Sequence, residues 1–278
     1  MGKNDPEALV LTGYGINCDY ETCEACSRAG FTSRRIHIND ILESSAMLFK
    51  YKLVVFPGGF SFGDDLGSGV AFASKVRFSA ARNGKKLYDS LMEYILRDGL
   101  VLGICNGFQI LVRLGIIPAV SSGYGTQLVT LAPNRDGYFI DRWVHLRVEE
   151  DSPNIFTRGI KALRLPVRHG EGRFISKNKD IFELIEKNNH ISLRYSDQNG
   201  TPAVEFPQNP NGSENSVAGI CDPSGRIFGL MPHPEAAVSF FQYPDWTKRR
   251  EEAFRKGIKH TGVGDGFFIF KNAYNYVK

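Results

Sequence analysis

Three short, unbroken apolar runs stand out in the first half of the chain, at residues 8–11, 53–56 and 100–104. Each run is followed by glycine, proline or small polar residues. Continuous apolarity over so few residues is typical of strands that are buried on both faces of a parallel sheet. Apolar residues recur at helical spacing over residues 87–95, and Asp98-Gly99 ends that pattern before the third run. Alternating strands and helices predict a helix-covered α/β sheet.

The second half of the chain has a different pattern. Residues 143–148 and 191–195 alternate between apolar and polar, which predicts half-exposed antiparallel strands. Two further apolar runs, 216–220 and 226–231, are separated by a turn-like Asp-Pro-Ser-Gly segment. Residues 246–258 are amphipathic at helical spacing. Because no repeat and no low-complexity linker divides the chain, residues 1–278 are expected to form a single domain.

Composition narrows the class of protein. The chain has 278 residues, of which 42% are hydrophobic and 23% charged, and its net charge is +4. A dense Lys/Arg run, a membrane-length apolar stretch and a leader-peptide pattern are all missing from the sequence. We therefore expect a cytoplasmic protein with no nucleic-acid or membrane partner. Five cysteines, an odd number, fit a reducing compartment.

The strongest candidate for chemistry is Cys105, in the segment Gly-Ile-Cys-Asn-Gly. A buried strand runs into this segment and an apolar helical pattern follows at once, which is the nucleophile-elbow arrangement. A side chain at Gly103 or Gly107 would clash in so sharp a turn. Backbone N–H groups at the helix start favour the thiolate, and the N–H of Asn106 is placed to donate to an oxyanion. A cysteine that is merely buried at the end of a strand can have the same local sequence. The assignment of Cys105 as a nucleophile therefore requires a general base elsewhere in the chain.

A candidate base lies far along the chain, at His233-Pro-Glu235, directly after an apolar run. In an extended segment, residues two apart point the same way, so His233 and Glu235 can share a face. A cysteine activated by a histidine that a carboxylate orients is the general arrangement for acyl transfer. Pro232 and Pro234 are expected to keep the segment extended and to prevent a helix. Both candidate segments follow strands, where α/β sheets place functional residues, and together they favour catalysis over a solvated turn.

Residues 103–109, with the distant His-Pro-Glu, resemble the signature of the class I (triad) glutamine amidotransferases. In that family a cysteine attacks the side-chain amide of glutamine, releases ammonia and forms a glutamyl thioester that water hydrolyses. The resemblance implies a flavodoxin-like, mostly parallel sheet with added antiparallel strands. It also implies Cys105 as the nucleophile, His233 as the general acid and base, and Glu235 as the residue that orients His233.

Further segments extend the resemblance. The loop 57–60 matches the family's oxyanion loop, so the N–H of Gly59 would join that of Asn106. Five segments resemble one branch of the family, the glutaminase subunits of phosphoribosylformylglycinamidine synthase in purine biosynthesis. These segments are residues 17–22, 58–64, 169–174, 209–213 and 229–235.

The resemblance also implies partners. Glutamine is the expected substrate, and this chain is expected to bind no metal or other cofactor. ATP, Mg²⁺ and the ribonucleotide would bind a separate synthetase subunit, which converts formylglycinamide ribonucleotide to the amidine. The complex can include a small third subunit. Since a free glutaminase would waste glutamine, we expect its activity to depend on the partner.

Other signals leave alternatives open. Cys18, Cys23 and Cys26 have a ferredoxin-like spacing, but Cys221 is the only cysteine left to complete an iron–sulfur ligand set, and no complete zinc set is apparent. The glycine-rich stretch 58–69 lacks the Gly-Lys-Ser/Thr ending of a phosphate loop. No other segment resembles an ATP site.

Three polar residues in the matched segments have open roles. His169 and Glu171 either line the glutamine pocket or the ammonia exit, or form an exposed loop pair. Gln109, one helical turn after Cys105, either contacts substrate or packs.

Three alternative functions remain. The first is an amidotransferase of another pathway, which the branch-specific segments argue against. The second is a non-catalytic protein that kept the fold, and the third is a general cysteine hydrolase with the same elbow. If Cys105 fails to react with a glutamine-like electrophile, the result favours the non-catalytic protein. Hydrolysis of amides or esters unrelated to glutamine favours the general hydrolase.

Overall fold

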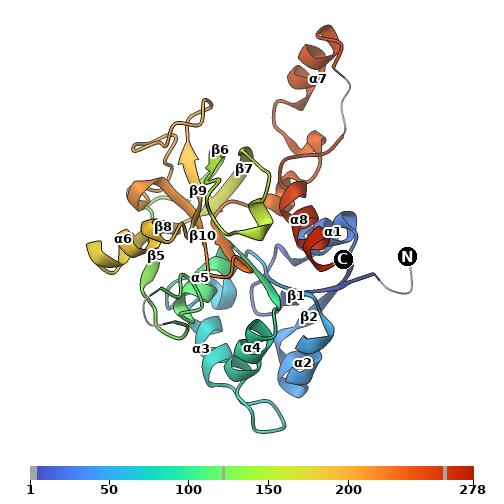
Figure 1. Ribbon diagram of the computed structural model, residues 1–278, viewed down its shortest axis with the longest axis vertical. Coiled ribbons are helices and arrows are strands. Elements are labelled where there is room, and N and C mark those ends of the chain that lie inside the picture. Colours follow the sequence, from blue (N-terminus) through green and yellow to red (C-terminus); the bar gives the residue numbers. More distant parts are fainter. Residues whose placement is uncertain (1–4, 121–122, 259–261) are drawn as a thin grey trace.

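A nine-stranded mixed sheet forms the centre of the computed structural model, which describes residues 5–120, 123–258 and 262–278 (Figure 1). Across the sheet, the strands are β2 (Thr32–His37), β1 (Glu7–Thr12), β3 (Leu53–Phe56), β4 (Leu100–Ile104), β11 (Ile227–Leu230), β10 (Val217–Cys221), β9 (Ile191–Ser196), β6 (Ile140–Val148) and β7 (Ala162–His169). Neighbours from β2 to β11 are parallel, and those from β11 to β7 are antiparallel. Strands β5 (Val129–Pro133) and β8 (Glu171–Ser176) pair separately. The predicted α/β fold, a largely parallel core with added antiparallel strands, is confirmed.

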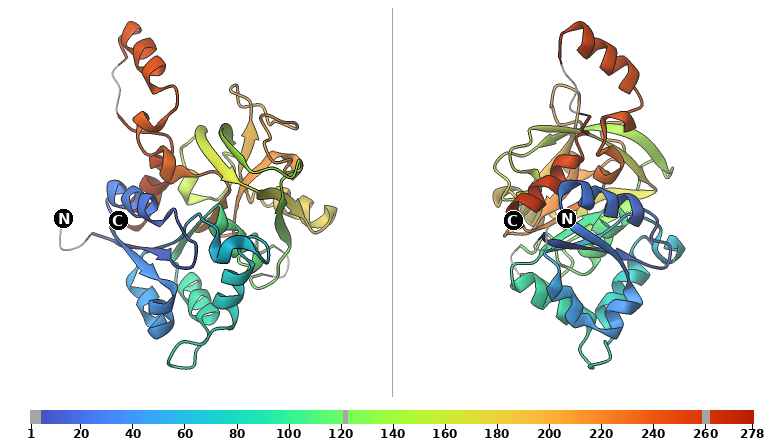
Figure 2. Two further views of the ribbon diagram at one scale, coloured as in Figure 1. Left: turned by 180° about the vertical axis from the view of Figure 1, so that it is seen from behind. Right: turned by 90° about the vertical axis from the view of Figure 1, so that its right-hand side faces the viewer.

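Helices cover both faces of the parallel half (Figures 1 and 2). Helices α1 (Asp19–Ala29) and α8 (Phe267–Val277) pack together on one face. On the other face, α3 (Val70–Phe78) packs against α4 (Leu87–Leu96) and α5 (Asn106–Arg113). This division is expected, because the chain leaves β1 and β3 in opposite directions across the sheet and right-handed crossovers then place the helices on opposite faces.

The remaining helices are short or peripheral. Helix α7 (Trp246–Arg255) projects from the body of the molecule, as Figure 2 shows. The others are α2 (Ile38–Glu43), α6 (Lys179–Lys187), and the 3₁₀ helices η1 (Ser45–Lys50), η2 (Ser61–Asp64), η3 (Ile155–Thr157), η4 (Glu214–Ser216), η5 (Pro234–Ala237) and η6 (Phe240–Gln242). In the described part of the chain, no helix has both the length and the apolarity to cross a membrane.

The local sequence patterns match the elements that form. The three apolar runs of the first half are β1, β3 and β4, and the residues of β3 and β4 are all buried. The helix predicted over residues 87–95 is α4, and the alternating runs of the second half lie in β6 and β9. Strand β2 was not predicted, since it lies at the sheet edge and has a half-exposed, polar sequence.

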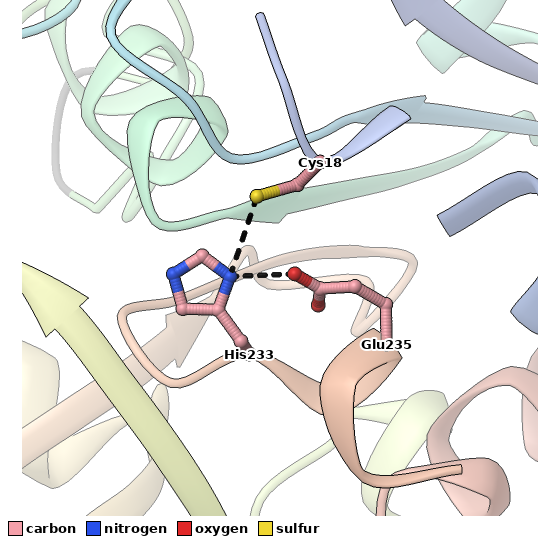
Figure 3. Close-up of side chains that lie close together, drawn as sticks. All are labelled: Cys18, His233 and Glu235. Carbon is pink, nitrogen blue, oxygen red and sulfur yellow. Dashed lines mark hydrogen bonds and ion pairs between the residues drawn. The ribbon is translucent and has the colours of Figure 1, made fainter. Parts of the chain in front are cut away.

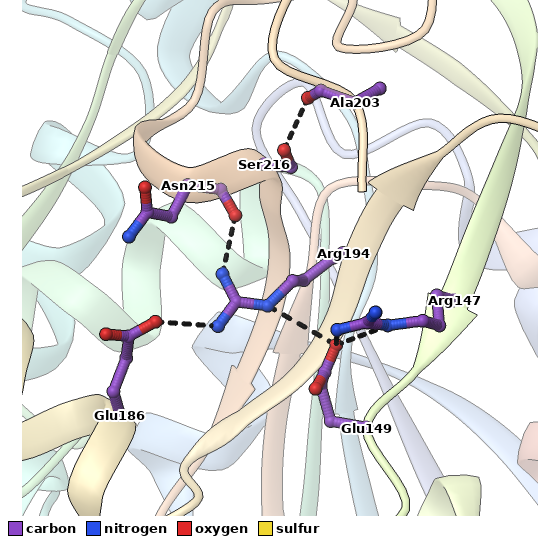
Figure 4. Close-up of polar contacts among 7 residues, drawn as sticks. All are labelled: Arg147, Glu149, Glu186, Arg194, Ala203, Asn215 and Ser216. Atoms are coloured by element: carbon purple, nitrogen blue, oxygen red, sulfur yellow. Dashed lines mark hydrogen bonds and ion pairs between the residues drawn. The ribbon is translucent and has the colours of Figure 1, made fainter. Parts of the chain in front are cut away.

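Polar contacts around Arg194 link the antiparallel half (Figure 4). This side chain, on β9, donates to the carbonyl oxygen of Asn215 at 2.6 Å and pairs with Glu186 of α6 at 2.9 Å. Its Nε lies 3.3 Å from Glu149, which also pairs with Arg147 at the end of β6 at 2.6 Å. Because Arg194 is only 13% exposed, these pairs are screened less than surface ion pairs. These ion pairs connect β6, β9 and α6.

The strand order decides which loops meet. Parallel pairing sets Ile104 of β4 opposite Leu230 of β11, although 126 positions separate them in the sequence. Strand β3 is the other neighbour of β4, with Phe56 opposite Gly103. The segments that follow β3, β4 and β11 therefore emerge at the same edge of the sheet, where open α/β sheets build their sites.

Candidate active site

Cys105 lies on a strained turn between β4 and α5. Its backbone angles are φ 51° and ψ −104°, a conformation that non-glycine residues rarely adopt. A Cβ added at Gly107 would lie 1.8 Å from the carbonyl oxygen of Phe56, and one added at Gly103 would lie 2.6 Å from a methyl group of Leu111. The prediction that both glycines are needed for this sharp turn is confirmed.

His233 and Glu235 lie together beside β7. Nδ1 of His233 is 2.5 Å from Oε1 of Glu235, and both side chains are almost completely buried. The backbone N–H of His233 donates to the carbonyl oxygen of Pro166 on β7 at 2.8 Å. The expectation that the prolines prevent a helix was wrong for Pro234, which begins the 3₁₀ helix η5. Proline fits this first position because its missing N–H would have had no partner within the helix.

One pocket brings the distant segments together. It has a volume of about 120 Å³ and contains both Cys105 and His233. The residues that line it are Asn17, Cys18, Gly59, Phe60, Cys105, Phe139, Arg168 and His233. Burial by itself lowers the pKa of His233, but the charges of Glu235 and Cys105 outweigh it and raise that pKa well above its ordinary value. Among the described residues, Nε2 of His233 has no hydrogen-bond partner, whereas Nδ1 contacts Glu235.

Gly59 and Asn106 are the residues whose backbone N–H groups are predicted to bind an oxyanion. Gly59 lines the pocket with φ +151°, and a Cβ there would lie 2.7 Å from the carbonyl oxygen of Gly15. Asn106 is the first residue of α5, where N–H groups have no partner within the helix. Neither N–H donates to an acceptor in the described ranges of the chain. Both groups therefore lack a competing acceptor, as the donors of an oxyanion hole do.

The polar residues with open roles lie outside this pocket. Nε2 of Gln109 donates to the carbonyl oxygen of Glu171 at 2.5 Å, and Oε1 of Gln109 accepts from the side chain of Asn106 at 2.9 Å. The carboxylate of Glu171 accepts from the N–H of Ser68 at 3.1 Å. Gln109 therefore packs, and its hydrogen bond links α5 to the start of β8.

His169 is buried rather than exposed, and it does not line the pocket. Its Nδ1 lies 3.1 Å from Oδ1 of Asn134. Desolvation, aided by the charge of His233, lowers the pKa of His169 to about 3. His169 therefore stays neutral at physiological pH.

Cys18 is a pocket residue that sequence analysis did not place. Its sulfur lies 3.9 Å from Nδ1 of His233 (Figure 3), and burial raises the pKa of this thiol. Ligand atoms of Cys18, His233 and Glu235 all lie within 4.8 Å of one another, and thiolate, imidazole and carboxylate are all groups that bind zinc. Cys23, by contrast, donates to Ser33 at 3.2 Å. The Asn-Cys-Asp segment directly after the first strand was the signal that could have located Cys18.

The match to a protein-family model defines the class of protein. Residues 5–277 match the CobB/CobQ-like glutamine amidotransferase domain. That range includes every residue of the pocket and the whole nine-stranded sheet. The chain therefore belongs to this family of glutamine amidotransferases.

Comparison with individual proteins narrows the assignment. The chain is 44% identical to the phosphoribosylformylglycinamidine synthase subunit PurQ of Methanococcus maripaludis, over 99% of both chains. It is 40% identical to the subunit of the same name from Dehalococcoides mccartyi, over 98% of both. A solved structure, PurLQS from Thermotoga maritima, superposes with a TM-score of 0.68 at 30% identity and covers 99% of this chain and 100% of that one. Within the family, the chain is thus a PurQ-type glutamine amidotransferase subunit of purine biosynthesis.

Proposed function

We propose that this chain hydrolyses glutamine at Cys105 and supplies the ammonia to a synthetase that converts formylglycinamide ribonucleotide to formylglycinamidine ribonucleotide. Membership of the PurQ subunits supports the reaction. One observation supports the residues: the strained Cys105 shares a pocket with His233, whose Nδ1 is held by Glu235.

The first half of the reaction forms a thioester. Nε2 of His233 takes the thiol proton, and the sulfur of Cys105 attacks the side-chain amide carbon of glutamine. The carbonyl oxygen becomes an oxyanion, which accepts hydrogen bonds from the N–H groups of Gly59 and Asn106. When the carbonyl re-forms, the C–N bond breaks and His233 gives its proton to the leaving nitrogen, which departs as ammonia.

The second half of the reaction regenerates the cysteine. His233 takes a proton from water, and the hydroxide attacks the thioester carbon at the same oxyanion site. The C–S bond breaks, Cys105 recovers its proton from His233, and glutamate leaves. The sum is glutamine plus water giving glutamate plus ammonia. Glu235 acts throughout by orienting the ring of His233 and stabilising its charged form.

The partners follow from the relatives. The Thermotoga maritima structure is described as PurLQS, and we extend that composition to this chain: a PurL-type synthetase and a small PurS-type subunit. In this proposal ATP and Mg²⁺ bind to the synthetase subunit, so this chain binds neither. The assembly operates in the cytoplasm, with no nucleic-acid or membrane partner.

The proposal is tested by reconstitution. The chain is mixed with its synthetase, the small subunit, ATP, Mg²⁺, formylglycinamide ribonucleotide and glutamine, and amidine and glutamate are both measured. We expect one glutamate per amidine, and much slower glutamine turnover by the chain alone. The synthetase alone, supplied with ammonium chloride, is the control for partner integrity. Amidine formation from ammonium chloride but never from glutamine would contradict the proposed function.

A further inference from the structure

Arg168 has an unusual position at the pocket. It lies near the end of β7, next to the buried His169, and it lines the pocket together with Cys105 and His233. Its side chain is 36% exposed, so the guanidinium is only partly in solvent. Apart from His233, Arg168 is the one basic side chain among the lining residues.

The buried N–H groups of Arg168 lack acceptors. Among the described residues, its Nε and Nη2 atoms have no hydrogen-bond partner. Nη2 lies 4.0 Å from Oε1 of Glu235, which is too far for a hydrogen bond, and that oxygen is already held by His233 at 2.5 Å. Leaving buried donors of a charged group unpaired is costly, and such groups in folded proteins usually have a functional explanation. By contrast, Arg164 on the same strand pairs with both carboxylate oxygens of Asp245, at 2.7 and 2.8 Å.

We propose that Arg168 binds the α-carboxylate of the glutamine substrate. This inference rests on the proposed function, because it assigns the other end of the molecule that Cys105 attacks. A guanidinium offers two parallel N–H donors that match a carboxylate, and the unpaired Nε and Nη2 are on the side of the group suited to such a bidentate contact.

The dimensions of the pocket fit this assignment. In glutamine, four bonds separate the attacked carbon from the carboxylate carbon, a span of about 5 Å when extended. The sulfur of Cys105 lies 3.7 Å from the backbone carbonyl oxygen of Arg168, so the arginine side chain begins close to the point of attack. Arg168 and Cys105 also line the same pocket, so a glutamine whose amide carbon lies at Cys105 occupies the space that Arg168 borders. Arg168 would then select an amide that carries a carboxylate over a simple amide.

The first test is kinetic, and it uses Arg168→Met in the reconstituted complex. Losing a charged, bidentate contact is expected to raise the KM for glutamine roughly 10- to 100-fold. The kcat at saturating glutamine should change much less, and Arg168→Lys should recover part of the loss. The matched control is Arg173→Met, because Arg173 also has a buried, unpartnered Nε but does not line the pocket. Its KM should match that of the wild type.

The second test changes the substrate. In the α-amide of L-glutamine, a neutral amide replaces the carboxylate. We expect the wild type to use this analogue roughly 10- to 100-fold less well than glutamine, and Arg168→Met to treat the two nearly alike, as in a double-mutant cycle. Equal discrimination by wild type and variant would overturn the proposal. So would an unchanged KM with a shifted pH profile of kcat, because Arg168 would then act through Glu235. A failure of the proposed function is distinct, since it would remove glutamine turnover from the wild type too.

Discussion

Nδ1 of His233 lies 2.5 Å from Oε1 of Glu235, although the two residues have different backbone conformations. His233 is extended, and Glu235 belongs to the 3₁₀ helix that Pro234 begins. This contact leaves Nε2 as the nitrogen that can exchange a proton with Cys105. Burial opposes a charge on His233, but the negative charges of Glu235 and Cys105 raise its pKa well above the ordinary value. The protonated form of His233 is therefore favoured once it has taken the proton of Cys105.

Replacing Glu235 with glutamine tests this coupling. Without the carboxylate charge, the pKa of His233 should fall, and the imidazolium should lose its proton at a lower pH. We expect kcat for glutamine to drop roughly 100-fold or more, and the alkaline limb of the pH profile to move to lower pH. Glu205→Gln, at a carboxylate that is 71% exposed, is the control. A Glu235→Gln variant with the wild-type kcat and pH profile would show that Glu235 does not support the base.

The close packing of Gly107 against β3 predicts that an added side chain at this position destabilises the protein. Because a Cβ at Gly107 would lie 1.8 Å from the carbonyl oxygen of Phe56, Gly107→Ala must displace β3 or the elbow. We expect a loss of about 1–3 kcal/mol in the free energy of unfolding, or more, together with loss of activity. Thermal unfolding gives the measurement.

Gly170→Ala is the matched control for the elbow, since the nearest atom to its added Cβ is in Phe139 at 3.9 Å. If the two alanine variants had the same melting temperature, the packing at Gly107 would be less restrictive than these distances imply.

Patterns within single segments were enough to predict much of the fold. The runs at β3 and β4 are buried on both faces, so their apolarity is unbroken, and the glycines around Cys105 reflect steric limits inside one turn. Strand β2 escaped prediction because Arg34 and Arg35 are exposed at the sheet edge. Its pairing with β1, not its own sequence, makes it a strand.

Contacts between distant segments could not be predicted in the same way. The approach of Cys18 to His233 depends on the sheet order β1-β3-β4-β11, which no local pattern encodes. The same holds for Arg168, which reaches the pocket because the backbone of β7 binds the N–H of His233. The burial of His169 could not be predicted either, because nothing in the surrounding glycine-rich sequence indicates whether a histidine there is buried or exposed.

The low pKa of His169 predicts an acid-dependent loss of stability. The folded protein protonates this residue at about pH 3, whereas an unfolded histidine titrates near pH 6.5. Between these values the unfolded chain binds a proton that the folded chain does not. The free energy of unfolding should therefore fall as the pH drops below 6.5, by up to about 1.4 kcal/mol per pH unit from this group.

His169→Gln isolates that contribution. Urea unfolding of both proteins from pH 7 to pH 4.5 should show a shallower loss in the variant. Some slope should remain, because burial also lowers the pKa of His190. Identical slopes would mean that His169 gains its proton in the folded state without penalty.

The ligand set around His233 predicts inhibition by zinc. A zinc ion bound by Cys18, His233 and Glu235 would replace the proton between Nδ1 and the carboxylate, and so disable the base. We expect glutamine turnover to fall with added Zn²⁺ and to recover with a chelator, while Mg²⁺, which prefers oxygen ligands, has no such effect. Direct titration should show weaker zinc binding in Cys18→Ala than in Cys105→Ala. The reverse order would place the metal at Cys105 instead.

The most direct measurement compares wild type and Cys105→Ala in the complete complex, each supplied with glutamine or with ammonium chloride. If Cys105 is the nucleophile, the variant forms no amidine from glutamine but forms it from ammonium chloride at the wild-type rate. Retained ammonia-dependent synthesis also shows that the variant has not damaged the synthetase. Amidine formation from glutamine by Cys105→Ala would contradict the assignment of Cys105 and the mechanism built on it.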